Sequence, residues 1–161
     1  MARKVPLQLT LNGEERAEFI DGGSTLLNAL RDRFGDTSPK GGCHQGTCGA
    51  CSVMVDGELK LSCLILAETC EGAEILTNGG LAEDGVLHPL QRAFMDEFAA
   101  QCGFCTSGMI MAAKALLDRE PNPSREDVVD ALSGNICRCT GYEPIIRAVL
   151  TAARSNSQNA A

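Results

Sequence analysis

Hydrophobic and polar residues alternate with a period of about two along the first half of the chain. The alternation begins with Leu7, Leu9 and Leu11. The dipeptide Asn12-Gly13 is a two-residue turn signal, and Phe19 continues the apolar alternation beyond it. This pattern predicts a half-buried β-hairpin at the start of the chain.

A short helix and a long loop are predicted next. Thr25 is a suitable N-cap for a helix that carries Leu26, Leu27 and Leu30. Glycine and proline then recur through residues 35–42, which indicates an irregular loop.

A second hairpin is predicted directly after this loop, around Asp56-Gly57. If these two residues form the turn, Val55 lies opposite Glu58 and Val53 lies opposite Lys60. The same register places Cys51 opposite Ser62 and brings the next residue, Cys63, to the base of the loop. Residues 73–77 supply a further predicted strand.

The second half of the chain changes to a period of about 3.6 residues. The change follows Asn78-Gly79-Gly80, which we take as the joint between two domains, residues 1–80 and 81–161. Apolar stripes predict four helices, and one of these stripes extends to Phe98. A capping box at Ser124 supports the third of these helices, and Pro144, which suits a first helical turn, supports the last. The predicted fold class is therefore α+β, with a strand-rich N-terminal domain followed by a four-helix bundle.

The composition excludes several partners. The formal net charge is -7, with 21 acidic and 14 basic residues, so the chain lacks the clustered basic charge that nucleic acid requires. No stretch is long and apolar enough to span a bilayer, and the first residues do not resemble a secretory signal. Nine cysteines without an export signal favour a reducing compartment. We expect a cytoplasmic protein, with export in the folded state alongside a signal-bearing partner as the alternative.

Eight of the nine cysteines fall into two quartets. The first consists of Cys43, Cys48, Cys51 and Cys63. Its C-x4-C-x2-C spacing with a distant fourth cysteine is typical of a plant-type 2Fe-2S site, and surrounding glycines suit a loop wrapped around an anion. A zinc ribbon or a disulfide knot fits this spacing less well. Small halves bury little apolar surface, so bound iron would also contribute to folding.

The second quartet consists of Cys102, Cys105, Cys137 and Cys139. Thirty-one residues separate its two cysteine pairs, and a helical hairpin between them would bring the pairs together. A four-cysteine zinc site remains a competing interpretation for this spacing. The ninth cysteine, Cys70, lies outside both patterns and is expected to be a small buried apolar residue.

Five short segments resemble the signatures of a known family. They are Lys40-Gly41-Gly42-Cys43, Gly46-Thr47-Cys48-Gly49-Ala50-Cys51, Gln101-Cys102-Gly103-Phe104-Cys105-Thr106, Gly108-Met109 and Asn135-Ile136-Cys137-Arg138-Cys139-Thr140-Gly141-Tyr142. Together they resemble the small iron-sulfur subunit of the xanthine dehydrogenase and carbon monoxide dehydrogenase (molybdenum hydroxylase) family. One departure is Ser107, where the family commonly has proline; serine there can still cap a helix.

The resemblance implies that the N-terminal domain is a ferredoxin-like β-grasp domain and that the helical bundle follows it. It also implies one 2Fe-2S cluster in each domain, held by the two quartets. It implies electron transfer from a molybdopterin cytosine dinucleotide cofactor in a large partner subunit, through both clusters, to FAD in a medium subunit or to another acceptor. It also implies that Gln101 and Cys139 lie near the pterin. Substrate chemistry would then belong to the partners, so no catalytic residue is assigned to this chain.

Two other classes of protein remain open from the sequence. The first is a free-standing two-cluster ferredoxin-type carrier, which would be a monomer competent in electron exchange. The second is a structural double-zinc protein, which would be colourless and lack acid-labile sulfide. The oxidised substrate would never contact this chain, so its sequence does not identify that substrate.

Overall fold

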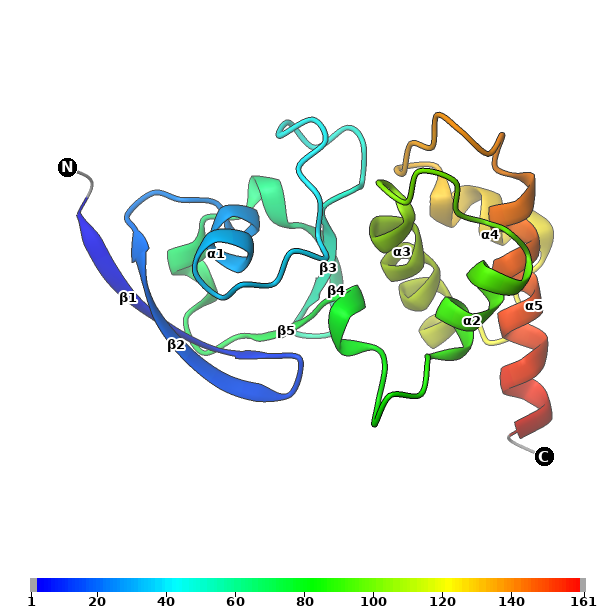
Figure 1. Cartoon of the computed structure of the whole chain (residues 1–161), viewed down its shortest axis with the longest axis horizontal. Coiled ribbons are helices and arrows are strands. Elements are labelled where there is room, and N and C mark those ends of the chain that lie inside the picture. The colour runs from blue at the N-terminus through cyan, green and yellow to red at the C-terminus, as the bar shows by residue number, and fades with distance from the viewer. Residues whose placement is uncertain (1–2, 160–161) are drawn as a thin grey trace.

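The computed structural model describes residues 3–159 and places a β-sheet half beside a helical half (Figure 1). In chain order the elements are β1 (Lys4–Leu11), β2 (Glu14–Asp21), α1 (Leu26–Asp32), β3 (Ser52–Val55), β4 (Glu58–Leu61), the 3₁₀ turns η1 (Ser62–Leu64) and η2 (Ala67–Cys70), β5 (Glu74–Leu76), the 3₁₀ turn η3 (Asn78–Gly80), α2 (Pro89–Asp96), α3 (Thr106–Arg119), α4 (Arg125–Leu132) and α5 (Glu143–Asn159). The predicted order of hairpin, short helix, second hairpin and four helices is confirmed.

The five strands form one sheet in the order β2-β1-β5-β3-β4. Strand β5 pairs in parallel with β1 and antiparallel with β3, so it joins the two hairpins. Helix α1, capped by Thr25 as predicted, contributes Leu26 and Leu30 to a core shared with Leu7 and Leu9 of β1. This sheet with its packed helix is the predicted β-grasp fold.

One detail of the first hairpin differs from the sequence prediction. Phe19 of β2 is 65% exposed, whereas the next residue, Ile20, is fully buried. The register explains the difference: Phe19 lies opposite Pro6, while Leu7 lies opposite Glu18. Successive side chains of a strand point to opposite faces, so Phe19 cannot share the face of Leu7.

The second hairpin has the predicted register. Val55 lies opposite Glu58 and Val53 lies opposite Lys60. The Ser62 N–H donates to the Cys51 carbonyl at 3.3 Å, which extends the pairing by one step beyond β3 and β4. Strand β4 then ends in η1, and this tight turn carries Cys63.

The helical half has its own core of buried residues from α2, α3, α4 and α5. Two helices begin with reciprocal caps: Ser124 and Asp127 form the predicted capping box of α4, and His88 caps α2. The predicted apolar stripe of α2 ends earlier than expected, because Phe98 lies beyond the helix and is 83% exposed.

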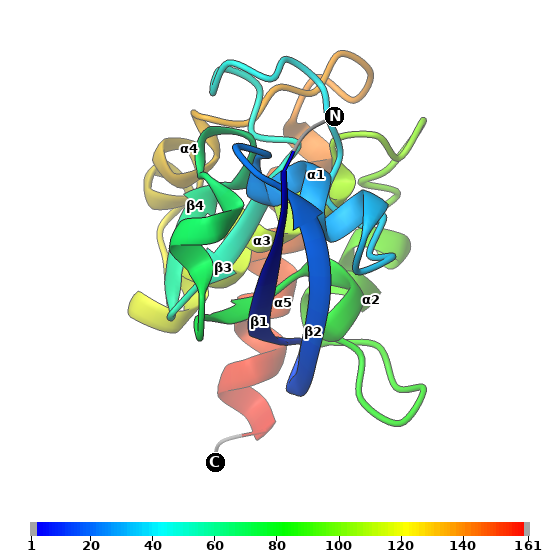
Figure 2. The same cartoon turned by 90° about the vertical axis from the view of Figure 1, so that its left-hand side faces the viewer.

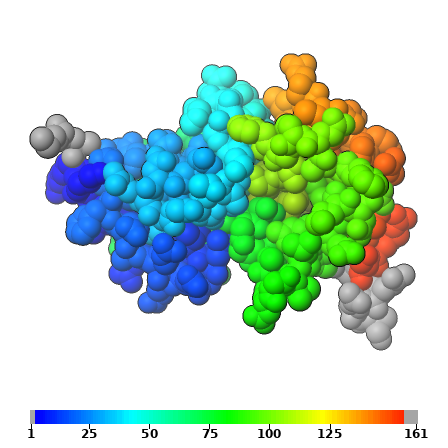
Figure 3. All heavy atoms as spheres, in the orientation of Figure 1, coloured from blue at the N-terminus to red at the C-terminus, as the bar shows by residue number. Residues whose placement is uncertain are grey.

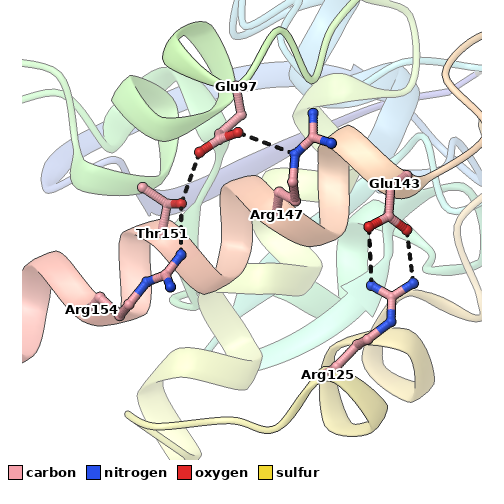
Figure 4. Close-up of polar contacts among 6 residues, drawn as sticks. All are labelled: Glu97, Arg125, Glu143, Arg147, Thr151 and Arg154. Atoms are coloured by element: carbon pink, nitrogen blue, oxygen red, sulfur yellow. Dashed lines mark hydrogen bonds and ion pairs between the residues drawn. The ribbon is translucent and has the colours of Figure 1, made fainter.

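Polar contacts orient the long helix α5 against its neighbours (Figure 4). Arg147 pairs with Glu97 at the end of α2 at 3.3 Å, and the Thr151 hydroxyl donates to the same carboxylate at 3.0 Å. Arg125 of α4 pairs with Glu143 of α5 at 2.8 Å. Exposed pairs of this kind contribute little free energy, so the buried apolar face holds α5 in place.

The two halves are in direct contact (Figure 3). Met54 of β3 belongs to the helical core, and Gly108 of α3 lies so close to the Gly49 carbonyl that a side chain at position 108 would overlap it. The predicted joint, Asn78–Gly80, is the 3₁₀ turn η3, and the Gln91 amide donates to the Asn78 carbonyl at 2.9 Å. In the described residues, no helix is long and apolar enough to cross a membrane.

Candidate metal centres

The first cysteine quartet lies around the long loop before β3. Its thiols interact in two pairs, Cys43 with Cys48 and Cys51 with Cys63. The loop supplies the first three cysteines, and η1 supplies the fourth. The hairpin therefore brings Cys63 back beside the loop, as its predicted register requires.

The environments of these four thiols differ. Hydrogen bonds from Thr47 and from the backbone N–H groups of Gln45 and Thr47 lower the pKa of Cys43 to about 5. Burial raises the pKa of Cys51 to about 11. The N–H groups around Cys43 are suited to stabilising a thiolate, which is the form that ligates iron.

Close packing explains why two positions of this loop, 42 and 49, are occupied by glycine. A Cβ atom at Gly42 would lie 2.8 Å from the Cys48 sulfur atom. Gly49 has a φ of +68°, and a Cβ there would overlap the Asn135 side chain from the other half. The loop can approach its own thiols and the helical half only without side chains at these positions.

The second quartet lies where α3 begins, opposite the loop between α4 and α5. The sulfur atoms of Cys102 and Cys139 are 3.6 Å apart. Cys105, the N-cap residue of α3, interacts with Cys137. Burial is the main cause that raises the pKa of Cys105 to about 12. The helical hairpin therefore brings the two cysteine pairs together, as the sequence predicted.

One hydroxyl group stabilises the turn that carries the second quartet's last two cysteines. The Tyr142 hydroxyl accepts a hydrogen bond from the Cys137 N–H at 3.0 Å and donates to the Asn135 carbonyl at 3.2 Å. The Thr140 hydroxyl lies 3.1 Å from the Cys137 sulfur atom. These three contacts are local and preorganise residues 135–142.

The donor set and its pairing fit 2Fe-2S clusters. The eight cysteines form four pairs, and a 2Fe-2S cluster takes two protein ligands at each of its two irons. A single zinc ion instead needs ligands gathered around one point. Within residues 3–159, no three His, Cys, Asp or Glu side chains are gathered in that way. All nine cysteines are free thiols.

The two quartets differ in exposure. Cys51 and Cys63 are buried, whereas Cys102 and Cys139 are exposed, as is Gln101 beside them. Cys70 is 2% exposed in the core of the sheet half, in agreement with its predicted apolar role.

The expected capping role of Ser107 is wrong. Cys105 is the N-cap residue of α3, and Ser107 lies within the first turn with its hydroxyl buried and without a partner among the described residues. Sequence reasoning also missed the roles of Asn135 and Tyr142. Both lie in a segment that carries the resemblance, but their contacts depend on how the loops fold.

Two family models match the chain in the same order as its two halves. The "2Fe-2S iron-sulfur cluster binding domain" matches residues 9–82, and the "[2Fe-2S] binding domain" matches residues 77–150.

Known proteins resemble nearly the whole chain. The nicotinate dehydrogenase small FeS subunit of Eubacterium barkeri is 47% identical over 91% of this chain and 93% of its own length. The nicotine 6-hydroxylase small subunit of Paenarthrobacter nicotinovorans is 46% identical over 92% of this chain and 90% of its own length.

A chain in the crystal structure of quinoline 2-oxidoreductase from Pseudomonas putida 86 superposes with a TM-score of 0.93 at 41% identity, and the match covers 98% of both chains. Fold, paired cysteines and similarity over nearly the full length agree. The chain belongs to the family of small iron-sulfur subunits of the xanthine dehydrogenase and carbon monoxide dehydrogenase type, the electron-transfer subunits of molybdenum hydroxylases.

Proposed function

We propose that each quartet holds one 2Fe-2S cluster. Cys43, Cys48, Cys51 and Cys63 are the ligands in the sheet half, and Cys102, Cys105, Cys137 and Cys139 are the ligands in the helical half. The observation that carries this assignment is the pairing of all eight thiols, two for each iron. When bound, each cluster accepts and releases one electron at a time.

The chain's own residues hold and insulate these sites. N–H groups around Cys43 stabilise its thiolate, and burial of Cys51 and Cys63 keeps water from one side of the first site. The Tyr142 hydroxyl fixes the turn that presents Cys137 and Cys139. No residue of the chain is proposed to move a proton or to attack a substrate.

The exposed edge of the second quartet is the proposed entry side for electrons. Gln101, Cys102 and Cys139 are all exposed there, so a partner can approach this site directly. A large subunit with a molybdopterin cytosine dinucleotide cofactor would cover this edge, with Gln101 and Cys139 near the pterin. A medium FAD-binding subunit or another acceptor would receive electrons from the first site.

Two further assignments are part of the proposal. Residues 1–80 and 81–161 form one cluster-binding unit each; the two distinct apolar cores support this division, with Met54 of β3 packed into the helical one. The assembly works in the cytoplasm, where reduced cysteines such as these nine persist.

The test is purification of the native complex through this chain, without oxygen, followed by metal, sulfide and flavin analysis. We expect about four irons per chain, an equal amount of acid-labile sulfide, and a molybdenum-containing large subunit. Electron paramagnetic resonance (EPR) of the reduced complex should show two 2Fe-2S signals.

Two variants locate the ligands. Cys105→Ala should abolish one EPR signal, whereas the matched control Cys70→Ala, which changes a buried cysteine outside both quartets, should keep both. A colourless protein containing zinc would refute the cluster assignment. A monomer with two clusters and no partner would identify a free-standing carrier instead.

A further inference from the structure

The two candidate cluster sites are joined by a pair of hydrogen bonds between their ligand loops. The Ile136 N–H donates to the Cys48 carbonyl at 2.9 Å. The Asn135 side-chain amide donates to the Gly49 carbonyl at 3.0 Å, and both partners are buried. Cys48 belongs to the first quartet, and Ile136 is bonded to Cys137 of the second.

We propose that Asn135 is a positioning residue for electron transfer: its bond to the Gly49 carbonyl holds the two ligand loops together and keeps in place the adjacent hydrogen bond from the Ile136 N–H to the Cys48 carbonyl, through which a bonded route joins the two clusters. This inference rests on the ligand assignment proposed above. The route runs from the Cys48 backbone through one hydrogen bond to Ile136, and then along the chain to Cys137.

The transfer itself moves one electron and no atoms. With both clusters bound, the donor would be oxidised by one electron and the acceptor reduced by one. The amide N–H and the carbonyl group of the bridge are unchanged, and no proton leaves either. The bridge contributes only distance and bonded connection, which are the properties that a protein controls for a bound cofactor.

The surroundings of the bridge suggest that its role is positional. The Gly49 carbonyl also accepts hydrogen bonds from the Ser52 hydroxyl at 2.7 Å and from the Ser52 N–H at 3.1 Å. This carbonyl would therefore remain satisfied without Asn135. What Asn135 adds is a bond between the two halves, at a place where neither Gly49 nor Gly108 leaves room for a side chain.

Ser52 provides a matched control. Ser52 and Asn135 are 2% and 5% exposed and donate to the same carbonyl oxygen, but only Asn135 comes from the other half. Ser52→Ala removes a buried hydrogen bond within the sheet half. Asn135→Leu removes one between the cluster loops and keeps the number and branching of the side-chain heavy atoms.

The experiment uses the full chain loaded with both clusters and reduced by dithionite. EPR measures the magnetic splitting between the clusters, and rapid photoreduction measures the rate of electron exchange between them. We expect Asn135→Leu to keep both clusters but to lose much of the splitting and to exchange electrons severalfold more slowly. Ser52→Ala should lower stability alone and leave both readouts at their wild-type values.

Each outcome has a defined meaning. Unchanged splitting and rate in an Asn135→Leu protein with two intact clusters would overturn the inference but not the proposed function. Wild-type chain with fewer than two clusters would overturn the proposed function. Asn135→Asp, which also lacks the donor, serves if the leucine variant does not fold. Hydrogen exchange of loaded wild type adds a test without mutation, because fast exchange of the Ile136 amide would also contradict the bridge.

Discussion

The two cysteine quartets offer the same set of four thiols from two different architectures. The first is local: one loop and one hairpin deliver all four cysteines within residues 43–63. The second depends on tertiary structure, because Cys102 and Cys139 meet only when the helices between them pack. Cys51 and Cys63 are buried in the first site, while Cys102 and Cys139 are exposed in the second.

This difference indicates separate tasks for the two sites. Cys51 and Cys63 of the first quartet form a small buried cluster with Leu27, so a metal cluster bound there would contribute to folding. The exposed edge of the second quartet leaves it open to a partner. One site is therefore expected to be more important for stability and the other for contact within the assembly.

The largest expected effect separates these tasks. Cys63→Ala should remove the first cluster and lower the stability of the protein, because the variant loses metal binding and leaves a cavity. A loss of 1 kcal/mol lowers the unfolding midpoint of a small domain by ~4–8 °C, and we expect a decrease well above this. Cys139→Ala should remove the second cluster's EPR signal with a smaller change in the midpoint. Calorimetry with EPR of both proteins measures the contrast; equal midpoints would contradict it.

The contact between the two halves gives the next effect. Gly108→Ala places a methyl group against the Gly49 carbonyl and the Ala50 Cα atom, and such overpacking costs about 1–3 kcal/mol. Gly134→Ala is the control, because nothing lies within 4 Å of its Cβ position. Urea unfolding should show a clear loss of stability for the first variant and a change of about 0.5 kcal/mol or less for the second.

Tyr142→Phe should affect only the second site. Its hydroxyl joins the Cys137 N–H to the Asn135 carbonyl, and losing this bond costs about 1 kcal/mol. We expect the EPR signal of the second cluster to shift while that of the first is unchanged. Thr69→Val, which removes a hydroxyl bonded to the Leu66 carbonyl in the sheet half, should leave both signals in place. A shift of the first signal in Tyr142→Phe would contradict the assignment.

The smallest effect concerns the cap of α2. Burial and the nearby Lys114 charge lower the pKa of His88, whose Nδ1 accepts from the Leu90 N–H at 3.2 Å. The unfolded chain therefore binds a proton at higher pH than the folded chain, and the free energy of unfolding falls as pH drops below about 6.5. His88→Asn keeps an acceptor that does not titrate, so its stability should change less over the same pH range. Parallel curves for the two proteins would show that His88 does not contribute.

Local features of the fold could be predicted from the sequence. Asp56-Gly57 determined the register of the second hairpin, and Ser124 with Asp127 determined the start of α4, because each depends on residues close in the chain. The cysteine spacings likewise gave the two quartets, which the structure brings together in pairs. The assignment of individual ligands stays a prediction.

Features that depend on distant contacts could not be predicted. The face of Phe19 follows from its pairing partner, and the exposure of Phe98 follows from where α2 ends. The Asn135 bridge joins residues 86 positions apart, so neither period nor motif reveals it. Ser107 was misread because its cap position depends on where the Cys105 turn begins.

Both cysteine-bearing loops lie on one side of the molecule, at the top of Figures 1 and 2, and the last turns of α5 lie on the opposite side. If the protein were attached to a solid surface through α5, the side that carries the cysteine loops would therefore face away from that surface. On a gold electrode, this orientation would direct the candidate iron sites away from the gold surface. Anchoring through an exposed position near the loops would instead place the candidate iron sites close enough to the electrode to exchange electrons with it.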